Sequence, residues 1–222
     1  MMQQSLFGMM EPATTATLAN PLAQPLEEAV FTVVDLETTG LQPRKNAITE
    51  ITAIRFKNGE DLGMYSTLVR PTEPIGEWVE NMTGITNEMV KDAPALVEVL
   101  AELLRFAGTD ALWVGHNVPF DIGFLQEKLH ETGLSSQRDR IRIEQAFCTR
   151  NLARKALPGL PSYEGIVVAT ACGVDNKNPH RAEYDVRMSA GILFALIDRL
   201  KLEQPGIRTV GDLLSYQGVL NL

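Results

Sequence analysis

The chain has few of the residues that build disulfide frameworks and zinc sites. Among its 222 residues there are two cysteines and three histidines, and no CxxC or His-rich spacing occurs. This scarcity argues against a disulfide scaffold and against a zinc site. Cys148 and Cys172 are therefore expected to be small buried hydrophobic residues rather than reactive thiols.

Long apolar runs and an excess of basic charge are also missing. No segment approaches the length of about 20 apolar residues that a membrane span needs, and the N-terminus lacks the basic-then-apolar order of a secretory signal. We therefore expect a cytoplasmic protein with no membrane association. The net charge of −8 argues against tracking a long nucleic acid by neutralising many phosphates. It is compatible with gripping a chain end, and carboxylates that hold divalent cations contribute to it.

The remaining composition is that of a folded protein. The chain is 45% hydrophobic and 22% charged, which indicates a soluble globular protein with one main domain. Residues 1–27 have no sustained period and no basic residue, so they are predicted to form a mobile tail. The domain is expected over residues 28–202, followed by a C-terminal extension over 203–222.

The order of apolar patterns predicts an α/β layered domain with a mixed central sheet. Strands are expected at 31–35, 48–56, 63–69, 111–114 and within 141–148, and the first three should form an antiparallel meander with a turn at Asn58-Gly59. Helices are expected at 94–106, after the HNVPFD segment with a C-terminal stop at Gly133, and at 149–156, 163–172 and 182–200.

Two acids end the most core-like strand, in the stretch VVDLETTGL. Alternate residues of a strand share a face, so Asp35 and Glu37 are expected to point the same way, a few ångströms apart. Like charges that close resist joint ionisation unless a cation lies between them. A strand that has simply reached solvent would give the same dipeptide spacing.

Two later segments each add one acid. Asp121 follows GHNVPF at the start of a helix, where it would also complement the helix dipole beside the cap candidate Asn117. In HRAEYDVR, His180 precedes Asp185 by five residues, at the start of the last long helix. A histidine ahead of a helix is also compatible with an ordinary surface side chain.

Together and in this order, VVDLETTGL, HNVPFDIGFL and HRAEYDVRMSA resemble the three exonuclease motifs of the DnaQ-like family, in its His-containing DEDD branch. The similarity extends from about Phe31 to Leu200 and includes the connector TGITNEMVKDAP. The resemblance implies a ribonuclease-H-like fold with a mixed five-stranded sheet flanked by helices. It also implies hydrolysis of a nucleic acid from its 3′ end, with release of nucleoside 5′-monophosphates in proofreading or repair.

The same resemblance implies a site for two divalent ions, Mg²⁺ or Mn²⁺. Asp35 would bridge both ions, Glu37 and Asp185 would complete the site of the ion that activates water, and Asp121 would serve the second ion. His180 would be the general base, since an ordinary histidine pKa of about 6.5 suits proton removal near neutrality. Independently of the family, phosphodiester hydrolysis by two hard cations calls for carboxylate ligands.

Further contacts follow from the family positions. Substrate-binding residues would be Thr38, Thr39 and Leu41 at the terminal nucleotide, and His116 and Asn117 close to the site. Six basic residues between Arg138 and Lys155 would either steer a nucleic acid strand or form a solvated face.

The sequence alone does not decide the substrate or the partners. DNA is favoured over RNA, but a 3′→5′ exoribonuclease of the same superfamily and a non-catalytic replication adaptor are alternatives. The segment QQSLF, Gln3 to Phe7, resembles the short peptides with which bacterial replication proteins bind the sliding clamp, and an arbitrary apolar tail would look the same. A DNA polymerase is a further expected partner.

Overall fold

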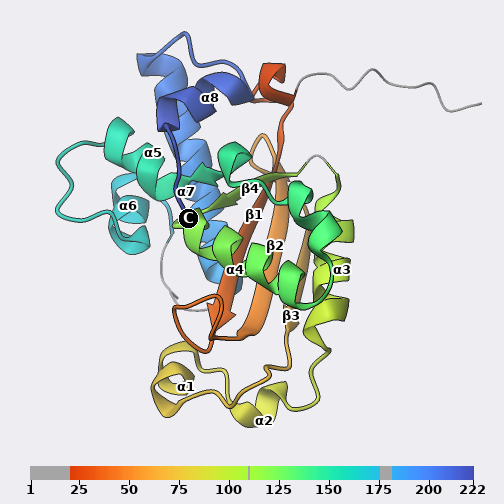
Figure 1. Ribbon diagram of the computed structural model, residues 1–222. Helices are drawn as coiled ribbons and strands as arrows, with labels where there is room; N and C mark the ends of the chain where they lie inside the picture. Colours follow the sequence, from red (N-terminus) through yellow and green to blue (C-terminus); the bar gives the residue numbers. More distant parts are fainter. Residues whose placement is uncertain (1–20, 110, 176–181) are drawn as a thin grey trace, which may run out of the picture.

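The computed structural model describes residues 21–109, 111–175 and 182–222, and its centre is a five-stranded sheet with the order β3-β2-β1-β4-β5 (Figure 1). The strands are β1 (Val30–Thr38), β2 (Ile48–Lys57), β3 (Glu60–Leu68), β4 (Leu112–Gly115) and β5 (Phe147–Cys148). Strands β1, β2 and β3 are antiparallel neighbours, whereas β4 runs parallel to β1 and β5 runs parallel to β4. The predicted mixed sheet is confirmed.

The turn between β2 and β3 follows directly from the sequence. Asn58 has φ 47° and Gly59 has φ 83°, so both central residues lie in the left-handed region that two-residue hairpins require. Asparagine and glycine reach that region at low cost. The Asn58-Gly59 turn thus sets the first pairs of the hairpin, Lys57 with Glu60 and Phe56 with Asp61, before the register shifts between Arg55 and Phe56.

The helices surround the sheet and include three that the apolar period did not predict. They are α1 (Glu77–Thr83), α2 (Asn87–Val90), α3 (Leu96–Ala107), α4 (Val118–Glu131), α5 (Thr149–Ala156), α6 (Gly165–Ala171), α7 (Ala182–Glu203) and α8 (Val210–Gln217), with short 3-10 turns at η1 (Pro21–Ala23), η2 (Ser135–Arg140) and η3 (Ile143–Gln145). Helices α1, α2 and α8 are short, so their periodicity is weak in the sequence. Within the described ranges, no helix combines the length and apolarity needed to cross a membrane.

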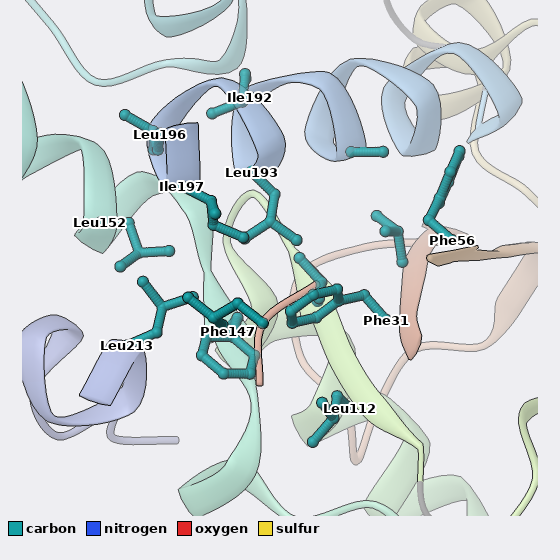
Figure 2. Packing of buried hydrophobic residues seen from close by; sticks show 14 of the residues in the cluster. Phe31, Phe56, Leu112, Phe147, Leu152, Ile192, Leu193, Leu196, Ile197 and Leu213 are labelled. Atoms are coloured by element: carbon teal, nitrogen blue, oxygen red, sulfur yellow. The ribbon is translucent and has the colours of Figure 1, made fainter. Parts of the chain in front are cut away.

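Two hydrophobic layers hold β1 in the middle of the domain. Phe31 and Val33 face a core built with α7, and Val34 and Leu36 face a second core built with α3 and α4. Figure 2 shows the first core, where the rings of Phe31 and Phe147 meet edge to face with centroids 5.5 Å apart. Each such buried side chain stabilises the fold by roughly 1.5–3 kcal/mol. The central strand β1 is therefore a rigid support for the residues that follow Val34 in the same strand.

The edge of the sheet at β5 is covered by the C-terminal helix. The buried Gln217 side chain of α8 accepts a hydrogen bond from the Cys148 backbone N–H at 2.6 Å and donates one to the Ala146 carbonyl at 3.0 Å. Leu213 of the same helix is fully buried in the core with α7 (Figure 2). Residues 203–222, expected as an extension, thus pack on the domain and satisfy an edge strand that would otherwise be open.

Residues 21–27, expected to belong to the tail, are also packed against the domain. The Leu26 backbone N–H donates to the Arg208 carbonyl at 2.9 Å, and the Val210 N–H donates to the Gln24 carbonyl at 2.9 Å. Leu26 itself is 3% exposed. Residues 21–27 therefore pack with the domain, because this segment pairs with the approach to α8, far away in the sequence.

Candidate active site

The acidic pair at the end of β1 lies on one face, as the strand spacing predicts. Asp35 and Glu37 share the face of Phe31 and Val33, toward α7, since side chains alternate along a strand. The pairing with β2 continues to Thr38, with an irregularity between Glu37 and Thr38. Both carboxylates are therefore held by a regular strand whose preceding residues are buried.

The third acid comes from α7, which crosses this face of the sheet. Asp185 lies in the first turn of the helix, and Ala182 and Val186 beside it are fully buried. Carboxylate oxygens of Asp35, Glu37 and Asp185 all lie within 4.8 Å of one another. Packing of α7 on β1 thus joins two segments that are 148 residues apart in sequence.

The fourth acid, Asp121, reaches the same place from α4. It is 5% exposed, and a Cβ placed on Gly115 at the end of β4 would lie 3.3 Å from its Oδ2. The Leu36 backbone N–H donates to the Asp121 carboxylate. Strand β4 pairs with β1 only as far as Val33. The Leu36 N–H is therefore not used by β4 and can donate to Asp121. The carboxylate is thereby placed beside Asp35.

Crowding of carboxylates at this partly buried site makes their ionisation unfavourable. Burial, followed by the charges of four neighbouring carboxylates, raises the pKa of Asp35 well above its ordinary value; these neighbours are Asp121, Glu37, Asp185 and Glu50. Burial also raises the pKa of Asp121 to about 8, although hydrogen bonds from its own backbone N–H and from Leu36 oppose the rise. A cation among these groups would favour their ionised forms and so oppose both shifts.

Glu50 is a member of this acidic environment that sequence reasoning missed. In the register of the hairpin it stands opposite Glu37, so both side chains emerge on the same face of the sheet. Its charge contributes to the raised pKa of Asp35. The strand was predicted but its register was not, and only the register shows that Glu50 adjoins the pair.

Of the two histidines expected at or near the site, only His116 lies in the part of the chain that the structure describes. His180 lies outside the described residues, two positions before the first residue of α7. His116 is held between the Thr149 hydroxyl, 2.9 Å from Nδ1, and the Tyr163 carbonyl, 2.9 Å from Nε2. Because a carbonyl only accepts, Nε2 carries the proton, and burial lowers the pKa of His116. These contacts tie the start of α4 to the segments around α5 and α6.

The other positions assigned to substrate binding lie around the ends of β1 and α4. Asn117 precedes α4 without a side-chain cap bond, and its Oδ1 accepts from Arg150 at 3.5 Å. Thr38 is 8% exposed and its hydroxyl donates to the Gly40 carbonyl at 2.6 Å. Leu41, in contrast, is 78% exposed on the loop after β1. A leucine held out in this way is available to contact a ligand.

The basic residues between Arg138 and Lys155 are used in part for internal contacts. Arg140 donates to the Leu104 and Gly108 carbonyls at the end of α3, at 2.6 and 2.8 Å. Lys155 donates to the Tyr216 carbonyl at 2.6 Å, and thus helps to hold α8. These contacts argue against treating the run as a single nucleic-acid-binding face.

The chemistry of the acidic cluster fits a hard divalent cation. Its donors are carboxylate oxygens from β1, α4 and α7, brought together by packing and not by adjacent sequence. Mg²⁺ and Mn²⁺ prefer such oxygens, whereas Zn²⁺ sites more often use thiolate or imidazole ligands. The arrangement can therefore hold a divalent cation.

Sequence comparison relates the chain to an exonuclease family and to DNA polymerase III proteins. Residues 32–193 match the model of the RNase_T exonuclease family. The chain is 35% identical over 175 residues to DNA polymerase III subunit epsilon of Aquifex aeolicus, covering 79% of this chain and 84% of that protein. It is 38% identical to a candidate bifunctional exonuclease/endonuclease of Mycobacterium tuberculosis and 34% identical to DNA polymerase III PolC-type of Caldanaerobacter subterraneus. These matches cover 86% and 85% of this chain but only 30% and 13% of the relatives.

Comparison with solved structures gives the same fold. Exonuclease X in complex with 5′ overhanging duplex DNA aligns with a TM-score of 0.61 and 26% identity, over 85% of this chain and 99% of that one. Exonuclease I of E. coli in complex with a dA16 oligonucleotide aligns with a TM-score of 0.66 and 20% identity, over 85% of this chain and 43% of the other. The ribonuclease-H-like architecture predicted from the motifs is thereby confirmed.

Proposed function

The chain belongs to the RNase_T exonuclease family, and from this premise we propose that it is a metal-dependent 3′→5′ DNA exonuclease that releases nucleoside 5′-monophosphates. The observation that carries the proposal is the close approach of the Asp35, Glu37 and Asp185 carboxylates, with Asp121 beside them. A protein that had kept only the fold would have no need to hold four carboxylates this close together, with Asp121 buried among them.

The acidic residues would hold two divalent ions, Mg²⁺ or Mn²⁺. Glu37 and Asp185 would bind one ion, Asp121 would serve the other, and Asp35 would contact both. When bound, such ions supply an activated water and neutralise charge on the attacked phosphate. The strand β1 fixes the direction of two carboxylates, so little reorganisation is needed when metal and substrate arrive.

His180 would act as the general base of the reaction. Its imidazole would take the proton of the attacking water, and its position just ahead of α7 places it five residues before Asp185 in the chain. An ordinary histidine pKa of about 6.5 leaves the neutral ring available near neutrality. Replacing His180 with Ala is therefore expected to lower kcat more than it weakens metal binding.

DNA is the favoured substrate, and its 3′ end the favoured site of attack. Two of the relatives are named as DNA polymerase III proteins, and Exonuclease X was solved with duplex DNA. Matched single-stranded DNA and RNA, each labelled in separate samples at the 5′ or the 3′ end, test both points. We expect the 3′ label to leave at once as a mononucleotide and the 5′ label to persist on a ladder of shortening DNA. Shortening from the 5′ end, or faster loss of RNA, would contradict the proposal.

A polymerase and a sliding clamp are the proposed partners, in a replication or repair role in the cytoplasm. The similarity to polymerase III proteins supports the first, and the resemblance of Gln3 to Phe7 to clamp-binding peptides supports the second. Residues 3–7 lie outside the described part of the chain. Replacing Leu6 and Phe7 together with Ala should abolish binding to an immobilised clamp and leave nuclease activity intact. Unchanged clamp binding by this variant would dismiss the docking peptide.

A further inference from the structure

The loop that follows the acidic pair is an ordered structure closed at its base. The Thr39 backbone N–H donates to the Ala47 carbonyl at 2.9 Å, and the Ala47 N–H donates to the Thr39 hydroxyl at 2.9 Å. Within the loop, the Gln42 N–H donates to Asn46 Oδ1 at 2.9 Å. Gly40 lies directly against that side chain, because an added Cβ would lie 2.7 Å from Asn46 Oδ1. Loop 39–47 is therefore cross-linked by hydrogen bonds both at its base and within its span.

One carboxylate from outside the loop joins its two arms. Glu73, in the segment between β3 and α1, accepts through Oε1 from the Thr39 hydroxyl and from Asn46 Nδ2, the latter at 3.4 Å. The hydrogen bond from Thr39 is the main cause that lowers the pKa of Glu73, so the acceptor is ionised near neutrality. Hydrogen bonds to a charged acceptor are stronger than those to a neutral one.

The loop also adjoins the helix that carries Asp121. A Cβ added to Gly123 of α4 would lie 3.8 Å from Pro43 Cγ, which places the middle of the loop against the first turns of that helix. Leu41 nevertheless remains 78% exposed beside this packed segment. The loop is thus supported on two sides, by Glu73 and by α4, while one apolar side chain is held in solvent.

We propose that Glu73 is a positioning residue, which holds loop 39–47 so that Leu41 and the backbone after Thr38 are preformed to receive the terminal nucleotide. This inference rests on the proposed function. Without Glu73, the Thr39 hydroxyl and the Asn46 amide would lose a shared acceptor, and the loop would have to become ordered during binding. That ordering cost would weaken substrate binding and would leave the acids on β1 in place.

Steady-state kinetics on a single-stranded oligonucleotide separate this role from catalysis. Glu73→Ala is expected to raise KM about tenfold with kcat changed less than about twofold, as for loss of a hydrogen-bonded charged acceptor. Glu73→Gln keeps an Oε1 that can accept from Thr39 and Asn46, and should remain near the wild-type KM. Glu77→Ala is the matched control, since it removes one negative charge from the exposed start of α1.

Hydrogen exchange of the loop gives a readout that does not depend on activity. The Thr39 and Ala47 amides should exchange faster in Glu73→Ala and stay protected in Glu73→Gln. If the wild type degrades nucleic acid and Glu73→Ala has the KM of Glu77→Ala, the positioning role is wrong. It is also wrong if Glu73→Ala lowers kcat with KM unchanged, or if loop exchange does not change. A wild-type protein without nuclease activity would instead overturn the proposed function, and the exchange result would still decide whether Glu73 orders the loop.

Discussion

Asp35 and Glu73 are both carboxylates on segments next to loop 39–47, yet their surroundings have opposite effects. Burial and neighbouring carboxylates raise the pKa of Asp35 well above its ordinary value, whereas the hydrogen bond from Thr39 lowers the pKa of Glu73. The carboxylates around Asp35 repel one another, whereas the hydrogen bonds from Thr39 and Asn46 hold the Glu73 carboxylate. Asp35 therefore belongs to a group of acids whose charge a cation would balance. Glu73 instead has a structural role, as a hydrogen-bond acceptor.

The largest expected difference between the two regions is in activity. Asp35→Asn should reduce exonuclease activity by about a thousandfold, since loss of several kcal/mol of metal-derived stabilisation costs tenfold for each 1.4 kcal/mol. The nearly isosteric amide should leave the fold intact, which circular dichroism can check. Nuclease assays in Mg²⁺ measure the effect. Activity at the wild-type level in this variant would remove Asp35 from the catalytic site.

The next difference is in the response to metal. Mg²⁺ or Mn²⁺ at about 100 times its dissociation constant should raise the Tm of the wild type by about 5–10 °C, because binding to the folded state alone adds free energy of unfolding. Asp35→Asn should lose most of this increase. Thermal melts with EDTA and with each ion measure it. A wild-type Tm that is indifferent to both ions would contradict the metal assignment.

A smaller effect is expected from pH in the absence of metal. The folded-state pKa of Asp121 is raised to about 8, whereas unfolded Asp titrates near about 4, so the folded state binds the extra proton between these values. Stability of the metal-free protein should therefore fall as pH rises from about 5 to about 8.

The matched variants separate the two regions in the same pH series. Asp121→Asn should flatten the decline measured by urea denaturation in EDTA. Glu73 has a lowered pKa, so its stabilising contribution is present above its unfolded-state pKa and is lost only as pH falls through the folded value. Glu73→Gln should accordingly leave the decline above about pH 5 unchanged. Equal slopes in all three proteins would mean that the acidic cluster is not strained.

The smallest effect should be that of Glu73 on metal binding. Glu73→Gln is expected to change the metal-induced increase in Tm by no more than about 1 °C, because its hydrogen bonds are to Thr39 and Asn46. The same melts with EDTA and Mn²⁺ give this value. A loss comparable with that in Asp35→Asn would show that the two regions are not independent.

Some of the acids in these two regions could be assigned from the sequence, and others could not. The two-residue spacing of Asp35 and Glu37 predicts a shared face whatever the strand pairs with, and the hairpin turn follows from Asn58-Gly59. Glu50 could not be assigned to the site, because its place depends on the register between β1 and β2. Glu73 could not be recognised either, since its partners Thr39 and Asn46 are 34 and 27 residues away.

The ends of the domain show the same limit. The approach to β1 and the helix α8 carry short, weakly periodic patterns, so they were predicted as a tail and an extension. Their place in the domain depends on contacts such as Gln217 with β5 and Leu26 with Arg208. Such contacts form only when distant segments pack together, and no local rule of spacing or propensity encodes them.

The sequence by itself determined the family, the sheet-forming strands and which acids can share a face, because these depend on motif order and on the period of local structure. Only the tertiary structure decided that Asp185 and Asp121 meet Asp35, that Glu50 stands beside them and that Glu73 closes loop 39–47. The physical reason is that the pKa of a carboxyl group depends on its burial and on the charges and donors within a few ångströms. Those neighbours are set by packing over more than a hundred residues of chain.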